Sequence, residues 1–244
     1  MTNKISTTLK PESLLNYLPI ELENKQLMLL DSLRFTLEMI DYNFSQLEFH
    51  LKELSTGKAN KIHYKIFNYA WTLIDHSQRF CLLYKRLNSS EQSIIKKLDY
   101  LYSFRNAIQH LDKNVEERII NNSRPIYGSI KWVVNDVVKN ETYSAILVSG
   151  IFNIKNIEFS QPTKQNHYTN FINDIKLETD TLKKIDNNEI NLSNLMLHIC
   201  EITDALDINL KNFIETNKLE LKDWKSRKDI LLNFKNQNTN ELSS

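Results

Sequence analysis

Apolar residues recur every three or four positions over long stretches of the first half of the chain. Between residues 21 and 55 the apolar positions of this repeat are Leu30, Leu33, Leu37, Ile40, Phe44, Leu47, Leu51 and Leu54. Gly57 follows the repeat. This spacing places one apolar seam along a helix, as in bundles and coiled coils. Similar helical patterns cover residues 61–87 and about 90–121. We therefore expect three long helices in this half.

The period of the pattern changes after Pro125. Residues 128–134 and 142–152 are rich in β-branched and aromatic side chains, and the polar stretch NDVVKNE lies between them. This arrangement predicts a β-hairpin. Alternation of apolar and polar residues at 171–178 predicts a third strand, and a short fourth strand is expected at 189–192.

Helical spacing returns at residues 194–214, and an amphipathic helix is expected at 218–234 before a polar tail. The pattern as a whole predicts a mainly α fold. It consists of a long-helix bundle with a small antiparallel sheet inserted between the third and fourth long helices. We expect one domain at 1–218 with its β insertion at about 126–192, followed by a C-terminal helix and tail at 219–244.

The composition agrees with a helical protein, because only three glycines and four prolines occur in 244 residues. The net charge of +1 gives no overall basic field for nucleic acid, so such a partner would need a local site. Cys81 and Cys200 lie in apolar runs far apart, which favours buried, reduced thiols. With no apolar run of signal-peptide or membrane-spanning type, we expect a soluble cytoplasmic protein. Residues 1–10 are polar and are expected to be loosely held.

The stretch FRNAIQHLD, residues 104–112, stands out within the third helical pattern. Arg105 falls in step with the apolar stripe, where a guanidinium needs a partner, a ligand or water. Asn106 and His110 are four residues apart and share one helix face. Arg105 and His110 are about 140° apart around a helix. This arc is either an ordinary solvated face or a site in which two copies meet about a two-fold axis.

Arg105, Asn106 and His110 fit an R-x4-6-H pattern with a polar residue directly after the arginine, and here the chain resembles the HEPN family. HEPN domains are helical bundles, and many are metal-independent ribonucleases of toxin–antitoxin, abortive-infection and CRISPR-linked systems. The resemblance covers residues 20–120 and 193–215, whereas the inserted sheet departs from the family pattern. Residues 110–132 also resemble a group of bacterial proteins, a likeness that implies no activity.

The resemblance implies catalytic roles for Arg105 and His110. His110 would act as general acid or base in the attack of an RNA 2′-hydroxyl on the adjacent phosphate, and Arg105 would stabilise the phosphate charge. Asn106 would orient the histidine or bind the sugar–phosphate. No metal or cofactor is implied. The expected partners are RNA, a second copy bound through the motif helix, and an antitoxin or defence-system protein.

Other candidate residues have simpler explanations. Asp75 and Arg79 are four apart in the order that favours a local ion pair, and His76 beside them is expected to be a histidine that is either satisfied by a hydrogen bond or half-exposed. These three side chains would otherwise line the same cleft as the motif. The sequence has no metal-ligand spacing and no glycine-rich phosphate loop. The alternative function is a non-enzymatic helical interaction protein in which Arg105 and His110 have structural roles. Any exposed part of the seam at 30–54 would then be a dimer or partner surface.

Overall fold

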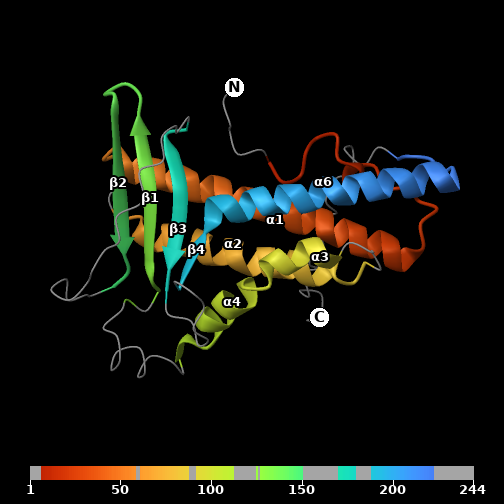
Figure 1. Ribbon diagram of the computed structural model, residues 1–244, viewed down its shortest axis with the longest axis horizontal. Coiled ribbons are helices and arrows are strands. Elements are labelled where there is room, and N and C mark those ends of the chain that lie inside the picture. Colours follow the sequence, from red (N-terminus) through yellow and green to blue (C-terminus); the bar gives the residue numbers. More distant parts are fainter. Residues whose placement is uncertain are drawn as a thin grey trace, which may run out of the picture.

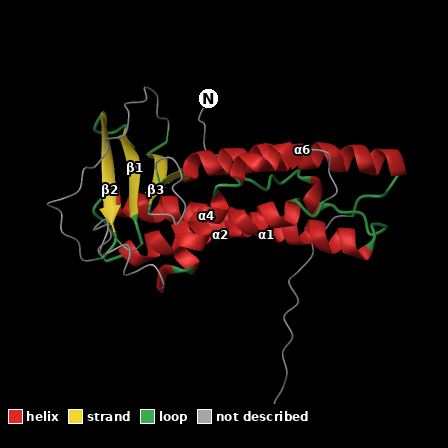
Figure 2. Cartoon of the chain, turned by 60° about the horizontal axis from the view of Figure 1, so that its bottom comes forward, coloured by secondary structure: helices red, strands yellow, loops and turns green. Residues whose placement is uncertain are grey.

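Three long helices run along the long axis of the molecule, and a four-stranded sheet lies across one end of them (Figures 1 and 2). The helices are α1 (Asn24–Ser55), α2 (His63–Tyr84) and α6 (Leu192–Asn217). This computed structural model describes residues 7–58, 61–87, 92–112, 125, 127–150, 170–179 and 188–222. The prediction of a mainly α fold with a small antiparallel sheet is confirmed.

The predicted seam of α1 forms the centre of the core. Leu33, Leu37, Ile40, Leu47 and Leu51 are fully buried, against α2 and α6. The seam is therefore core, and only Leu54 at its end is partly buried. Burial of this stripe stabilises the helix pair far more than intrinsic helix propensity does.

The prediction of one helix at 90–121 is wrong, because the chain forms two short helices there. Helix α3 (Gln92–Ile95) passes into a 3₁₀ turn at Lys96–Leu98, and α4 (Leu101–Gln109) follows in a different direction (Figure 1). The buried side chains recur at every third position: Ile95, Leu98, Leu101, Phe104 and Ala107. Residues three apart lie above one another in a 3₁₀ helix, which has i→i+3 hydrogen bonds, whereas in a straight α-helix they drift around the axis. The chain therefore forms a 3₁₀ turn here, and these residues stay on the buried side. Residues 113–121 of the expected helix lie outside the described residues.

The sheet has the strand order β2-β1-β3-β4 and is antiparallel throughout. Strands β1 (Ser129–Asp136) and β2 (Glu141–Val148) pair from Ser129 opposite Val148 to Asp136 opposite Glu141, so the predicted hairpin is confirmed. The remaining predicted strands are β3 (Ile172–Glu178) and β4 (Glu189–Asn191), and β4 leads directly into α6.

One face of the sheet shares its core with the helices. Ile130, Trp132 and Val134 of β1 are buried in the same cluster as the α1 seam. The end of α1 anchors the sheet through Ser55, whose hydroxyl accepts from the Trp132 indole at 2.9 Å and whose carbonyl accepts from the Tyr143 hydroxyl at 3.3 Å. This docking places the end of β2 near the start of α2.

Residues 7–16 form a strap that lies on α1 and α6 and includes a short 3₁₀ helix, Leu14–Asn16. The expectation of a loose N-terminus is wrong for residues 7–10, since the backbone N–H groups of Thr8 and Leu9 donate to the Asp41 carboxylate. At the other end, α6 stops at Lys218, whose φ is 52°. The expected helix at 218–234 does not begin there, because residues 218–222 are turn and irregular backbone, and 223–244 lie outside the described residues.

Candidate functional site on helix α4

The three motif residues lie on α4 and at its end. Arg105 and Asn106 are half-buried and His110 is exposed. The His110 N–H still donates to the Asn106 carbonyl at 3.1 Å, but its φ of −108° and ψ of 27° end the helix. The histidine side chain therefore projects from the last turn of a short, separately directed helix.

Arg105 reaches α2, where it meets an acid–base pair that the sequence suggested. Its Nε donates to Asp75 Oδ1 at 2.8 Å, and the Nε of Arg79 donates to Asp75 Oδ2 at 2.7 Å. The predicted i,i+4 pair is confirmed, and Asp75 bridges it to the motif. The Arg105 side chain is 24% exposed, so the partner that its position at the apolar edge required is this carboxylate.

The two arginines control the charge of Asp75. Burial by itself would raise the pKa of this carboxyl, but the hydrogen bonds from Arg105 and Arg79 outweigh it and hold the pKa below its ordinary value. Asp75 is thus ionised at neutral pH. The cluster contains two guanidinium groups and one carboxylate, and its net charge is positive.

His76 follows Asp75 on α2 and is half-buried. Burial lowers the pKa of its imidazole, Asp75 opposes that change, and Arg79 adds to it. Its Nδ1 is buried and has no hydrogen-bond partner in the part of the chain that the structure describes. The ring is therefore held as a neutral group beside the Asp75 cluster.

No hydrogen bond or ion pair between described residues joins Arg105 and His110, and the side chain of Asn106 likewise makes none to a described residue. The two positions are about 140° apart on an ideal helix, which favours a site that a second copy completes over one within a single chain.

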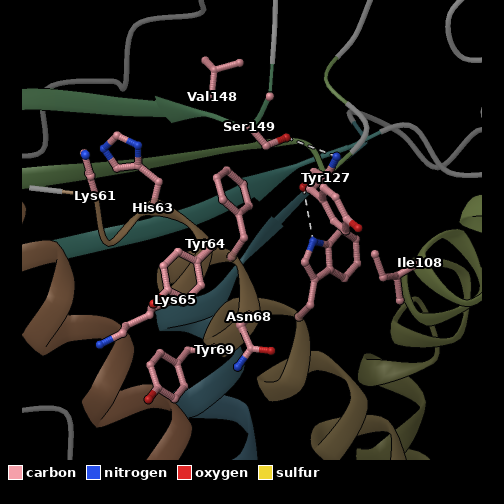
Figure 3. A pocket seen from close by; sticks show the side chains of 13 residues that line it. Lys61, His63, Tyr64, Lys65, Asn68, Tyr69, Ile108, Tyr127, Val148 and Ser149 are labelled. Atoms are coloured by element: carbon pink, nitrogen blue, oxygen red, sulfur yellow. Dashed lines mark hydrogen bonds between the residues drawn. The ribbon is translucent and has the colours of Figure 1, made fainter.

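A cleft with a volume of about 1030 Å³ lies beside α4 (Figure 3). The start of α2 lines one side, Tyr127 and the end of β2 line another, and Ile108 of α4 stands at the edge. Ile108 is one turn beyond Arg105, and Trp71 in the wall is one turn before Asp75. The cleft and the Asp75 cluster are therefore neighbours on the α2–α4 surface.

The sequence did not single out the cleft residues. Their signal was the stretch GKANKIHYK, residues 57–65, in which lysines are interleaved with a histidine and a tyrosine. Such a stretch resembles an ordinary solvated helix start. Only the docking of the sheet places Tyr127 and Ser149 in the same cleft, where Tyr127 accepts from Trp71, 56 residues earlier in the sequence.

Metal ligation and membrane insertion find no support among the described residues. That part of the chain contains no group of three or more histidine, cysteine or acidic side chains placed to hold a metal ion. None of its helices combines the length and apolar character needed to cross a bilayer.

Comparisons with protein-family models, with curated proteins and with solved structures gave no match. The likeness to HEPN proteins therefore rests on the Arg105–His110 spacing and its helical setting. The features of the described residues that bear on function are the Asp75 cluster, the exposed His110 and the adjacent cleft.

Proposed function

We propose that the chain is a metal-independent endoribonuclease of HEPN type, with Arg105 and His110 as its catalytic residues and Asn106 as a substrate-binding residue. The observation that carries the proposal is the way Asp75 holds Arg105. Only Nε is used in that bond, and the Nη N–H groups have no acceptor among the described residues. A guanidinium fixed in this way presents a planar fork of donors suited to a phosphodiester.

Charge supports the same conclusion. Arg79 and Arg105 share one carboxylate, so the cluster keeps one net positive charge and attracts an anion. Arg105 is three-quarters buried, and electrostatic stabilisation is stronger where water is partly excluded. A phosphate that becomes more negative in the transition state would gain from this arrangement.

The reaction needs one proton acceptor and one proton donor. The ribose 2′-hydroxyl gives its proton to a base as its oxygen attacks phosphorus, and the P–O5′ bond breaks as the leaving oxygen takes a proton. The products are a 2′,3′-cyclic phosphate and a 5′-hydroxyl, and DNA is resistant because it lacks the 2′-hydroxyl. His110 is exposed and able to exchange a proton with RNA in this role.

A second copy of the chain completes the site in this proposal. The two copies meet through α4, so that Arg105 of one and His110 of the other flank one phosphate. Such an activity suits the toxic effector of a toxin–antitoxin or antiphage module, held in check by a partner protein.

The first experiment measures cleavage of a labelled single-stranded RNA in the presence of EDTA. Wild type should release cyclic-phosphate ends, and Arg105→Ala and His110→Ala should each lower the rate by about 10²-fold or more. Arg86→Ala, an exposed arginine at the end of α2, is the matched control and should cleave normally. Equal rates for all four proteins with equal melting temperatures would overturn the proposal.

A mixing experiment tests the two-chain site. Neither Arg105→Ala nor His110→Ala alone has an intact site, but a mixed dimer has one site that contains both wild-type residues. Random pairing therefore restores about a quarter of the wild-type sites. No recovery after the two variants are unfolded and refolded together would place both residues in one chain.

The alternative is a non-enzymatic interaction protein, and one surface favours it. On the outer side of α1, large apolar side chains recur every seven residues and are 47–71% exposed: Met28, Phe35, Tyr42 and Phe49. This row is separate from the buried seam. Under this alternative, Phe35→Ser with Tyr42→Ser changes the particle mass in light scattering, and wild type leaves RNA intact.

A further inference from the structure

The described residues in the walls of the cleft beside α4 combine cations with aromatic rings and include no acid. The thirteen lining residues are Lys61, His63, Tyr64, Lys65, Phe67, Asn68, Tyr69, Trp71, Ile108, Tyr127, Val148, Ser149 and Gly150. None is aspartate or glutamate, although the whole chain has 30 of them against 31 lysines and arginines. The cleft is thus a local basic site on a nearly neutral protein.

The cations of the cleft are not neutralised by neighbouring described residues. The side chains of Lys61 and Lys65 make no ion pair or hydrogen bond to a described residue, in contrast to Lys10, Lys85 and Lys176, which each pair with a carboxylate. Both lysines lie at the start of α2, where the helix dipole adds positive potential. The N-cap residue, Ile62, has no side-chain oxygen to cap the first turn. An anion bound here would be attracted by Lys61, by Lys65 and by the N-terminal end of the helix dipole.

The aromatic part of the cleft is held in place by hydrogen bonds. The Trp71 indole donates to the Tyr127 carbonyl at 3.2 Å, and the Tyr127 N–H donates to the Ser149 hydroxyl at 3.1 Å (Figure 3). Tyr127 is therefore fixed through both of its backbone groups. Tyr127 as a residue is 48% exposed, and Tyr64 is 70% exposed. Exposed rings on a fixed backbone are suitable for stacking with a planar ligand.

We propose that this cleft binds a nucleotide unit, with its base stacked on Tyr64 or Tyr127 and its phosphate held by Lys61 and Lys65. The volume of about 1030 Å³ is at the upper end for small-molecule sites and has room for a base, a ribose and a phosphate. A ligand without a ring would leave the aromatic surface unused, and one without negative charge would leave the lysines unused. The nucleotide is either free in solution or part of a single RNA strand.

Binding at the cleft does not depend on cleavage by Arg105 and His110. Every lining residue except Ile108 lies outside α4. The test therefore uses the His110→Ala protein, which keeps RNA intact under the nuclease proposal and has an unchanged cleft. Nucleotide binding by the His110→Ala protein would support the proposed binding site in the cleft, whether or not the wild-type protein is a nuclease.

The experiment follows tryptophan fluorescence, to which Trp71 in the cleft wall contributes, and the heat of binding during titration with four probes: AMP, adenosine, inorganic phosphate and a five-nucleotide single-stranded RNA. AMP should bind at least tenfold more tightly than adenosine or phosphate. Lys61→Ala with Lys65→Ala should weaken AMP about tenfold or more and reduce its salt dependence. Tyr64→Ala or Tyr127→Ala, whichever removes the ring on which the base stacks, should weaken it about tenfold. Tighter binding of the RNA than of AMP identifies a strand as the ligand, and the reverse identifies a free nucleotide.

Matched controls come from the far half of α6. Lys211→Ala and Phe213→Ala remove an exposed lysine and a partly exposed ring without touching the cleft, and both should bind AMP normally. Because the substituted cleft residues are exposed or half-exposed, melting temperatures should change little. Should Tyr64→Ala unfold the protein, Lys61→Glu serves as the second variant and should abolish AMP binding. Absence of AMP and RNA binding, equal affinity for phosphate and AMP, or binding that the cleft variants leave unchanged would overturn the proposal.

Discussion

At one place in this molecule a carboxylate binds two arginine side chains, and at another place carboxylates bind backbone N–H groups. Under the N-terminal strap, Asp41 accepts the N–H groups of Thr8 and Leu9, and Asp207 accepts the Ser13 hydroxyl and the Leu14 N–H. On the α2–α4 surface, Asp75 accepts from two arginines instead. Neutral donors leave a negative, half-buried carboxylate that is bound to its own chain. Two guanidinium donors leave a positive site, and the Nη groups of Arg105 have no acceptor among the described residues.

The pKa values of these carboxyls move in opposite directions for this reason. Burial raises the pKa of Asp41 and of Asp207, and their hydrogen bonds reverse it only in part. At Asp75 burial also acts to raise the pKa, but two cationic donors overcome it. A carboxylate that binds its own backbone serves the fold, whereas one that orients cations towards the surface is suited to binding an anion. Four predictions test this contrast.

The largest effect is expected for Asp75→Ala on RNA cleavage. Arg105 would lose the contact that fixes its orientation, and misplacement by about 1 Å costs on the order of 10²-fold in rate. Cleavage assays should show that loss per folded molecule, and the melting temperature should also fall because the largely buried Arg105 loses its partner. Asp99→Ala removes a surface carboxylate that pairs with Lys85 and is the matched control. If Asp75→Ala were as active as wild type, Asp75 would not contribute to RNA cleavage.

Asp41→Ala is expected to affect stability instead. Two backbone N–H groups lose their acceptor, at a cost of about 2 kcal/mol in the free energy of unfolding. The melting temperature should fall by about 4–8 °C. RNA cleavage per folded molecule should remain that of wild type. Unchanged thermal unfolding would mean that the strap does not stabilise the bundle.

Acidification should affect the two places in opposite ways. The folded pKa of Asp75 lies below the ordinary value of 3.8, so its contribution to stability is present above that value and is lost as pH falls through the lowered pKa. The folded pKa values of Asp41 and Asp207 are raised, so protonation as pH falls through them relieves the cost of burying charge. NMR titration of the carboxyl carbons should give a midpoint below 3.8 for Asp75 and above it for the other two.

The smallest effect is expected for Arg79→Ala. Its side chain is 57% exposed, and a surface ion pair contributes about 0–1 kcal/mol to stability. Arg105 keeps its bond to Asp75 in this variant, so cleavage should fall less than in Asp75→Ala. Comparing the two variants in one assay shows whether Asp75 acts mainly through Arg105.

Helices and strands with strong local periodicity were predictable from the sequence. The seam of α1 and the hairpin of β1 and β2 each follow one repeat over many residues, so local pattern and tertiary burial agree. The third helix was mispredicted because the buried residues, among them Ile95, Phe104 and Ala107, recur every three positions and not with the alternating steps of three and four that a straight α-helix requires. Over a short stretch, a spacing of three is compatible with either an α-helix or a tighter turn, and packing decides between them.

By itself the sequence determined that Arg105 lies at an apolar edge and needs a partner, that Asp75 and Arg79 form a local pair, and that Asn106 and His110 follow Arg105 closely. Tertiary structure alone decided that the partner of Arg105 is Asp75, 30 residues earlier. It also brought Tyr127 and Ser149 to the start of α2 and tied residues 7–16 to α1 and α6. The physical reason is that local periodicity is set within one helix or strand, whereas contacts between distant segments depend on how the finished elements pack.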